Sequence, residues 1–274
     1  MILFYQHRIV LRNNPDIKEK RNFKEFLIRF DKQEDDLNSL KSHKIRTDIH
    51  RKALHVFPAG IIIFLWIFAI YIWDGLWNAD EVWRITGQQF GRFLILTTGY
   101  SGILIFGTLD YIRLSFIFDN HNFFYLIPDN VLDLLGKTMK REENYNYIKP
   151  VVLALSFVPI FIFPFGIFAA ASLIATLGDG AASVFGLRFG NIHFPKSSEK
   201  TIAGYIAGFL VSFFIAFISL WLFETSLKMF EIFLISFSGA ITFFIIDVSN
   251  LKVDDNILNP VFSALIMGLL YYIL

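Results

Sequence analysis

The chain has 274 residues, of which 55% are hydrophobic and 18% aromatic, and its formal net charge is +1. This composition is typical of an integral membrane protein, and the near-zero net charge gives no support for nucleic-acid binding. The sequence contains no cysteine, which excludes disulfides, thiolate catalysis and cysteine-bound metals.

The most highly charged part is the first 55 residues, which carry 13 Lys/Arg and 8 Asp/Glu. Residues 16–42 predict an amphipathic helix, since Asn14-Pro15-Asp16 is a helix-start signal and aromatic and aliphatic residues follow at helical spacing. The Lys-rich opposite face of this helix suits anionic lipid headgroups. We therefore expect 1–50 to be a cytoplasmic, amphipathic segment at the membrane interface and 51–274 to form the transmembrane domain.

Seven apolar segments predict an all-α polytopic bundle of about seven transmembrane helices. They are 56–73, 90–110, 149–165, 167–187, 201–223, 229–247 and 258–274. Pro164-Phe165-Gly166 predicts a tight helical hairpin between the third and the fourth. The aromatic stretch 113–127 is interrupted by polar residues, which favours an interfacial or re-entrant segment over an eighth crossing.

The distribution of basic residues predicts the orientation. With seven crossings and the N-terminus inside, 22 of the 25 Lys/Arg fall on the inner side. Such an asymmetry indicates a cytoplasmic N-terminus. The polar clusters that could carry chemistry all fall on that same face.

Two clusters lie at the ends of the first two apolar segments. Arg51, Lys52 and His55 stand at i, i+1 and i+4, so on a helix they could converge on phosphate oxygens. The alternative is a basic topology signal that snorkels to the interface. Asp110 and Arg113 stand at i, i+3, and an interfacial ion pair is the favoured interpretation.

Asp179 lies between Gly178 and Gly180 at the end of a strongly apolar run. An acid at the edge of hydrocarbon is expensive, and small neighbours allow a ligand to approach the backbone closely. We therefore expect a Gly-Asp-Gly corner that holds a metal ion or ligand, with a simple helix cap as the alternative. Gly186 and Gly190 could extend this small-residue face or serve helix packing.

Two polar loops follow. In Lys196-Ser197-Ser198 a cation and two hydroxyls precede a helix start, which suits phosphate oxygens as well as ordinary helix capping. In Asp254-Asp255-Asn256 three hard oxygen donors stand together, which suits Mg²⁺ as well as a solvated turn.

The ordered motifs RKALH, LGDGAASVFGLRFG, FPKSSEKTIAG and DDNILNP resemble the family of dolichol kinases, phytol kinases and CTP-dependent diacylglycerol kinases. These enzymes are related to the CDP-diacylglycerol synthases. The resemblance covers roughly residues 48–274. By position, Arg51-Lys52 matches the family's Arg-Lys pair, Asp179 its Gly-Asp acid, Lys196-Ser197 its Lys-Ser element and Asp254-Asp255-Asn256 its closing acidic loop.

Two positions depart from the family pattern. Lys200 stands where a glycine commonly ends a KS-x-E-G run, and Asp247 stands where an acid, usually Glu, precedes the last loop. Both departures bear on nucleotide choice more than on reaction class.

The resemblance implies that 51–274 is a lipid-kinase-like catalytic domain. It would transfer the terminal phosphate of CTP, or of a related nucleotide, to the hydroxyl of a membrane lipid alcohol such as a polyprenol, dolichol or diacylglycerol. Mg²⁺ is the expected cofactor and CTP the co-substrate. The expected location is the plasma membrane or the endoplasmic reticulum, with the active site cytoplasmic.

The roles implied for this chain are as follows. The catalytic residues are Asp179, Lys52, Arg51 and Lys196. The phosphate-binding residues are Gly178, Gly180, Ser197, Ser198, His55 and Asn256, and the metal ligands are Asp179, Asp254 and Asp255. Candidates for the group that takes the proton are Asp179, Asp110 and His55. A CDP-diacylglycerol synthase-like cytidylyltransferase is the nearest alternative, and a secondary transporter is the alternative of another class.

Overall fold

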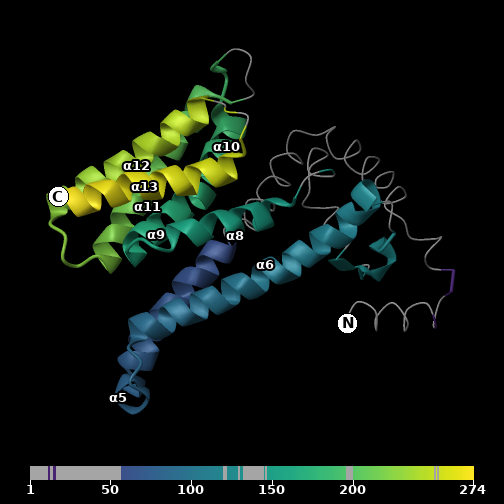
Figure 1. Ribbon diagram of the computed structural model, residues 1–274. Helices are drawn as coiled ribbons and strands as arrows, with labels where there is room; N and C mark the ends of the chain where they lie inside the picture. The colour runs from purple at the N-terminus through teal and green to yellow at the C-terminus, as the bar shows by residue number, and fades with distance from the viewer. Residues whose placement is uncertain are drawn as a thin grey trace. The chain divides into compact units, whose positions relative to one another are not determined.

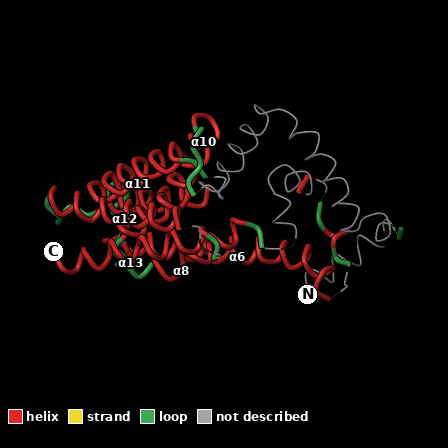
Figure 2. The backbone as a smooth tube through the Cα atoms, turned by 90° about the horizontal axis from the view of Figure 1, so that it is seen from above, coloured by secondary structure: helices red, strands yellow, loops and turns green. Residues whose placement is uncertain are grey.

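The computed structural model describes residues 12, 15–16, 57–119, 122–128, 130–131, 145, 147–195, 200–249, 251 and 253–274. Every regular element within these residues is a helix, as Figure 2 shows. The predicted all-α fold is therefore confirmed for the described residues. The amphipathic helix predicted for 16–42 lies outside them, apart from Asp16.

Within the described residues, six helical stretches are long and apolar enough to cross a membrane, which confirms a polytopic helical bundle. They are Phe57–Asp74, Gly87–Ser115, Phe165–Phe189, Ile202–Phe223, Met229–Ser249 and Asp255–Ile273. The predicted third segment is instead the shorter helix α8 (Lys149–Ile160), of 12 residues. Its length is about 18 Å at 1.5 Å per residue, against a hydrocarbon core of about 30 Å. The helix ends before Pro164, which is the N-cap of the next helix, although the apolar composition runs on.

Helix α6 (Gly87–Asp119) is longer than its apolar sequence predicts. Residues 113–119 continue this helix, so the prediction of a separate segment over 113–127 is wrong for these residues, while their position at the membrane interface stays a prediction. Asp110 and Arg113, whose charges neutralise each other, are compatible with this continuous helix. Beyond α6, the element seen within 122–128 is the short 3₁₀-helix η2 (Phe124–Leu126).

The first spanning helix ends in the π-helix η1 (Phe68–Asp74), and the short helix α5 (Ala79–Trp83) follows it. The Asp74 carboxylate then accepts a hydrogen bond from the Gly87 N–H at 2.6 Å. This bond satisfies a backbone donor at the start of α6, where a helix has no partner of its own. The rings of Trp73 and Phe90 stack at 3.9 Å beside it.

The chain forms two compact units. Ile103–Val151 belongs to the first, while Asp48–Gly102 and Val152–Leu274 belong to the second. The second contains a bundle of six elements: α9 (Phe165–Leu173), the π-helix η4 (Ile174–Gly178), α10 (Asp179–Phe189), α11 (Ile202–Phe223), α12 (Met229–Ser249) and α13 (Asp255–Ile273). Helix α11 packs against α9, α10 and α12, and α13 packs against α12 and α9. The C-terminus and the α10–α11 connection lie at opposite ends of this bundle (Figure 1).

Small residues let the helices of the bundle approach closely. A Cβ atom on Gly204 of α11 would lie 2.7 Å from the Ala182 carbonyl oxygen of α10. A Cβ atom on Gly208, one turn further along, would lie 2.7 Å from the Phe243 ring of α12. Close backbone approach through small residues is the usual way in which helices associate inside a membrane. These contacts bring α10, α11 and α12 together at the end of the bundle that the basic residues predict to be cytoplasmic.

Glu224 ties three helices together at the other end of the bundle. Its carboxylate accepts a hydrogen bond from the Gly166 N–H at 2.7 Å and one from the Tyr271 hydroxyl at 3.3 Å. Gly166 lies in the first turn of α9, where backbone N–H groups lack partners within the helix. Glu224 is itself the C-cap residue of α11. It therefore joins α11, α9 and α13.

We expect Glu224→Ala to lower the free energy of unfolding by about 1–3 kcal/mol, because it leaves the Gly166 N–H without its acceptor. Glu224→Gln keeps an oxygen for that N–H, and we expect it to change stability by much less. Thermal unfolding in detergent, followed by circular dichroism, measures both variants. Equal losses in the two variants would show that the bond to Gly166 is not what matters.

Comparing the natural protein with Glu224→Gln also tests how stability depends on pH. Burial raises the pKa of Glu224 above its ordinary value of 4.5, although the bonds from Gly166 and Tyr271 oppose this. The folded state therefore binds this proton more tightly than the unfolded state. Stability should fall as pH rises from about 4.5 through the raised pKa. Glu224→Gln should remove that part of the pH dependence.

Asp110 and Arg113 form a buried ion pair in the first unit. The guanidinium donates through Nη2 at 2.9 Å and through Nε at 3.2 Å to Oδ1 of Asp110. The other carboxylate oxygen accepts a hydrogen bond from the Ile148 N–H at 2.8 Å. Both side chains are almost fully buried. The predicted pair is present and is buried within the protein, and its bonds give Asp110 a structural role.

Candidate functional site

Half of the predicted site residues lie within the described part of the chain. They are Gly178, Asp179, Gly180, Asp254, Asp255 and Asn256. The other half lies outside it: Arg51, Lys52, His55, Lys196, Ser197 and Ser198. Predictions about this second group stay predictions.

Asp179 begins helix α10, but it does not form a corner. The π-helix η4 runs directly into α10, and Gly178 and Asp179 both have right-handed helical backbone angles. The predicted Gly-Asp-Gly corner is therefore wrong, and the N-cap position of α10 is occupied by Gly178 and not by Asp179. The apolar, Ala-rich run continues as a helix, and η4 is the wider π-helical turn that connects α9 to α10 without a break. Such π-turns are frequent at functional sites.

Three glycines near Asp179, namely Gly178, Gly186 and Gly190, serve helix packing. A Cβ atom on Gly186 would meet the Thr201 hydroxyl at 3.0 Å and the Gly204 backbone at 3.6 Å. A Cβ atom on Gly190 would overlap the Thr201 side chain. Of the two interpretations of Gly186 and Gly190, the structure thus favours packing. Gly178 likewise faces α11, where an added Cβ atom would overlap the Ser212 hydroxyl.

We expect Gly178→Ala to destabilise the protein by about 1–3 kcal/mol, because the new methyl group collides with the Ser212 hydroxyl. The double variant Gly178→Ala/Ser212→Ala should regain this loss, since the next atoms that the methyl meets are at 3.7 Å. Thermal unfolding of the single and double variants measures the coupling. Without recovery in the double variant, the packing explanation is wrong.

Ser212→Ala alone is the matched control. Its buried hydroxyl oxygen has no hydrogen-bond partner within the described residues. Removing it is therefore expected to be neutral or slightly stabilising.

The acidic loop before α13 is held together by Asn256. Asp254 caps α13 by accepting from the Asn256 backbone N–H at 3.0 Å. The Asn256 side-chain amide donates to Asp254 at 2.8 Å and to Asp255 at 3.1 Å. Asn256 thus orients the two carboxylates, whereas its predicted role was to bind phosphate directly.

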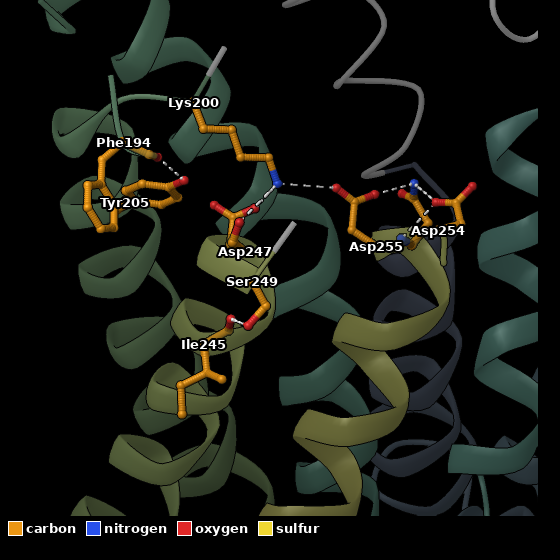
Figure 3. A network of polar contacts seen from close by, with 9 residues as sticks. Phe194, Lys200, Tyr205, Ile245, Asp247, Ser249, Asp254 and Asp255 are labelled. Carbon is orange, nitrogen blue, oxygen red and sulfur yellow. Dashed lines mark hydrogen bonds and ion pairs between the residues drawn. The ribbon is translucent and has the colours of Figure 1, made fainter. Parts of the chain in front are cut away.

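Lys200 is the central residue of the site, and the predicted residue set does not include it. Its Nζ donates to Oδ1 of Asp247 at 2.5 Å and to the Asp247 carbonyl oxygen at 3.4 Å. It also lies 3.8 Å from Oδ2 of Asp255. Figure 3 shows the Lys200 ammonium between the Asp247 and Asp255 carboxylates. Asp254 lies on the far side of Asp255. Lys200 therefore links α12 to the start of α13.

The loop that ends at Lys200 is closed at its base. His193 and Thr201 form an antiparallel bridge, and the Phe194 N–H donates to the Lys200 carbonyl oxygen at 3.1 Å. The Tyr205 hydroxyl of α11 donates to the Phe194 carbonyl oxygen at 2.6 Å. These bonds fix both ends of the segment that carries the predicted phosphate-binding residues 196–198.

Carboxylates from three helices act on the same ammonium. Burial alone would lower the pKa of Lys200, but the charges of Asp247, Asp255 and Asp179 and the Asp247 hydrogen bond outweigh it, so the pKa is raised. Lys200 is therefore a stable cation at neutral pH. Asp179 and Asp255 are far apart in the sequence, yet both act on Lys200 at one end of the bundle.

The residues present suit a magnesium–phosphate ligand better than an isolated metal ion. Within the described residues, no three Asp, Glu or His side chains come close enough to hold a metal ion. Mg²⁺, however, is usually bound through one or two carboxylates together with substrate phosphates. The oriented pair Asp254–Asp255 supplies donors of that kind, and Asp179 adds a further negative charge.

The sequence drew attention to Lys200 and Asp247 singly, but not as partners. They are the two positions that depart from the motif pattern, and the structure pairs them with each other.

Comparisons with protein-family models, with curated proteins and with solved structures find no match for this chain. The resemblance to lipid kinases stays a hypothesis that rests on the motifs.

Proposed function

We propose that this protein is a membrane-embedded phosphotransferase that moves the terminal phosphate of CTP, or of a related nucleotide, to the hydroxyl of a lipid alcohol. One observation supports this proposal above the others. Lys200 forms ion pairs with Asp247 of α12 and Asp255 of α13 at one end of an apolar bundle, and the charge of Asp179 at the start of α10 also acts on it. The loop that carries Lys196 and Ser197 is anchored at the same place by Lys200.

Phosphoryl transfer needs positioning and charge neutralisation more than covalent chemistry by the protein. In this proposal the carboxylates of Asp254 and Asp255 would hold Mg²⁺ together with phosphate oxygens, and the ion would neutralise phosphate charge. Asp179 would add a further negative charge to the site without completing a three-carboxylate metal centre. Arg51, Lys52 and Lys196 contact the phosphate oxygens, and Ser197 donates a hydrogen bond to one of them. Asn256 keeps the carboxylates of the acidic loop in position.

Apolar side chains beside the polar cluster support a lipid acceptor. Four large apolar residues on α10 and the following loop are exposed: Phe185, Phe189, Ile192 and Phe194. Leu251 and Val253, just before the acidic loop, are exposed as well. Exposed apolar residues next to a charged site suit the membrane interface. A lipid alcohol could present its hydroxyl there while its chain stays in the bilayer.

The test is to incubate the purified protein with labelled CTP, Mg²⁺ and a panel of lipid alcohols. The expected products are a phosphorylated lipid and CDP. Release of pyrophosphate with phosphatidic acid as substrate would instead favour the cytidylyltransferase. Substrate flux into liposomes without nucleotide, together with no phosphorylated product, would favour the transporter and overturn the proposal.

A further inference from the structure

Lys200 has an unusual concentration of negative charge around it. Its ammonium contacts Asp247 and lies 3.8 Å from Asp255, and the charge of Asp179 also acts on it. The Asp247 side chain is only 5% exposed, whereas that of Asp255 is 39% exposed. An ionised carboxylate as buried as Asp247 needs a compensating positive charge.

We propose that Lys200 is the resident cation of this site: its tethered ammonium holds the Asp247 and Asp255 carboxylates together, in the place that a divalent ion would take if the lysine were absent. Only the relevance of this inference to phosphate transfer rests on the proposed function. The charge relationship itself rests on the contacts of Lys200. In that role Lys200 is a positioning residue.

The alternative, that the Lys200 side chain serves only to close the loop, has less support. The loop base is closed by the His193–Thr201 bridge, by the backbone bond between Phe194 and Lys200, and by the Tyr205 hydroxyl. Each of these bonds is independent of the Lys200 ammonium. The side chain instead extends from the loop to the end of α12 and the start of α13 (Figure 3). Its contacts are therefore those of a counter-ion.

Loss of the ammonium would remove the positive charge that lies between the carboxylates of Asp247 and Asp255. Asp247 and Asp255 are hard oxygen donors, and such donors bind Mg²⁺, Mn²⁺ and Ca²⁺. A tethered ammonium supplies the same positive charge at every divalent-ion concentration. The carboxylate cluster of the natural protein would then need only the metal ion that enters with the nucleotide.

The chain contains no cysteine, so Lys200→Cys introduces a single thiol that can be modified selectively. Alkylation of this thiol with 2-bromoethylamine gives a side chain that again ends in an ammonium group and closely matches lysine. Mn²⁺ binding is measured by electron paramagnetic resonance, and thermal stability is measured with EDTA and with millimolar Mg²⁺. Both use the metal alone, without nucleotide.

We expect unmodified Lys200→Cys to bind one more Mn²⁺ per protein than the natural chain. Its Tm in EDTA should be lower by roughly 5 °C, and Mg²⁺ should restore much of this loss. Aminoethylated Lys200→Cys should bind no extra Mn²⁺ and should have nearly the natural Tm in EDTA. Lys200→Arg, which keeps the charge, should behave in the same way as the aminoethylated protein.

The double variant Lys200→Cys/Asp247→Asn removes one carboxylate together with the ammonium, and it should gain neither the extra Mn²⁺ nor the response to Mg²⁺. If Lys200→Cys cannot be purified, Lys200→Gln serves in its place with the same expected Mn²⁺ result. Lost stability that divalent ions do not restore, with no additional Mn²⁺, would overturn the inference. If the ion results hold but the natural protein transfers no phosphate, the proposed function fails and the inference about Lys200 stands.

Discussion

Replacing Asp179 by asparagine is expected to lower CTP-dependent phosphorylation of the lipid by a factor on the order of 10²–10³. Asp179 begins α10, and its carboxylate acts on the Lys200 ammonium at the end of the bundle where the proposed phosphate site lies. Asparagine has nearly the same size but removes the negative charge. The change should therefore weaken metal–phosphate binding while the helix stays folded. Initial rates over a range of Mg²⁺–CTP concentrations measure the effect on kcat and KM separately.

The matched control is Glu81→Gln, which removes one negative charge from an exposed residue of α5. It should keep nearly full activity. The thermal stability of Asp179→Asn should stay close to that of the natural protein, so that lost activity is not lost folding. Activity of Asp179→Asn within a few-fold of the natural protein would remove Asp179 from the proposed machinery.

The helical class of this protein could be predicted from the sequence because it depends on local composition. Long apolar runs have to satisfy their backbone groups internally, and in a membrane a helix does so. The lengths were less predictable. Helix α8 is shorter than its apolar run because a turn precedes Pro164, whereas α6 is longer and continues through the neutralised pair of Asp110 and Arg113.

The candidate site was predictable only in part, because the sequence shows local composition but not the contacts between distant residues. Asp179, Asp254 and Asp255 could be chosen because acids next to apolar segments are costly and therefore informative. The helical backbone conformation at Asp179 could not be predicted, because glycine next to an acid is as compatible with a corner as with close helix packing. The contact of Lys200 with Asp247 joins residues 47 positions apart. Local spacing carries no information about such a pair.

The roles of the small residues were decided by helix packing that no single segment encodes. Gly186 could have lined a ligand site, but Thr201 and Gly204 occupy the space in front of it. Gly178 faces Ser212 for the same reason. Whether a glycine serves a ligand or a neighbouring helix depends on the distance to that helix, which the sequence does not state.

Arg113→Met is expected to destabilise the protein by about 3–5 kcal/mol, the largest stability effect predicted for this chain. The substitution leaves the Asp110 carboxylate buried in α6 without the guanidinium that contacts it at 2.9 Å. In apolar surroundings an uncompensated carboxylate is more costly than the lost ion pair is stabilising, so the single variant should lose most of its thermal stability or its yield in detergent. The double variant Asp110→Asn/Arg113→Met removes both charges, and the asparagine oxygen can still accept the Ile148 N–H. It should therefore recover much of the loss, as measured by thermal unfolding of the two variants in the same detergent. Equal destabilisation of the single and double variants would show that the packing of the Arg113 side chain, and not the unpaired charge on Asp110, accounts for the effect.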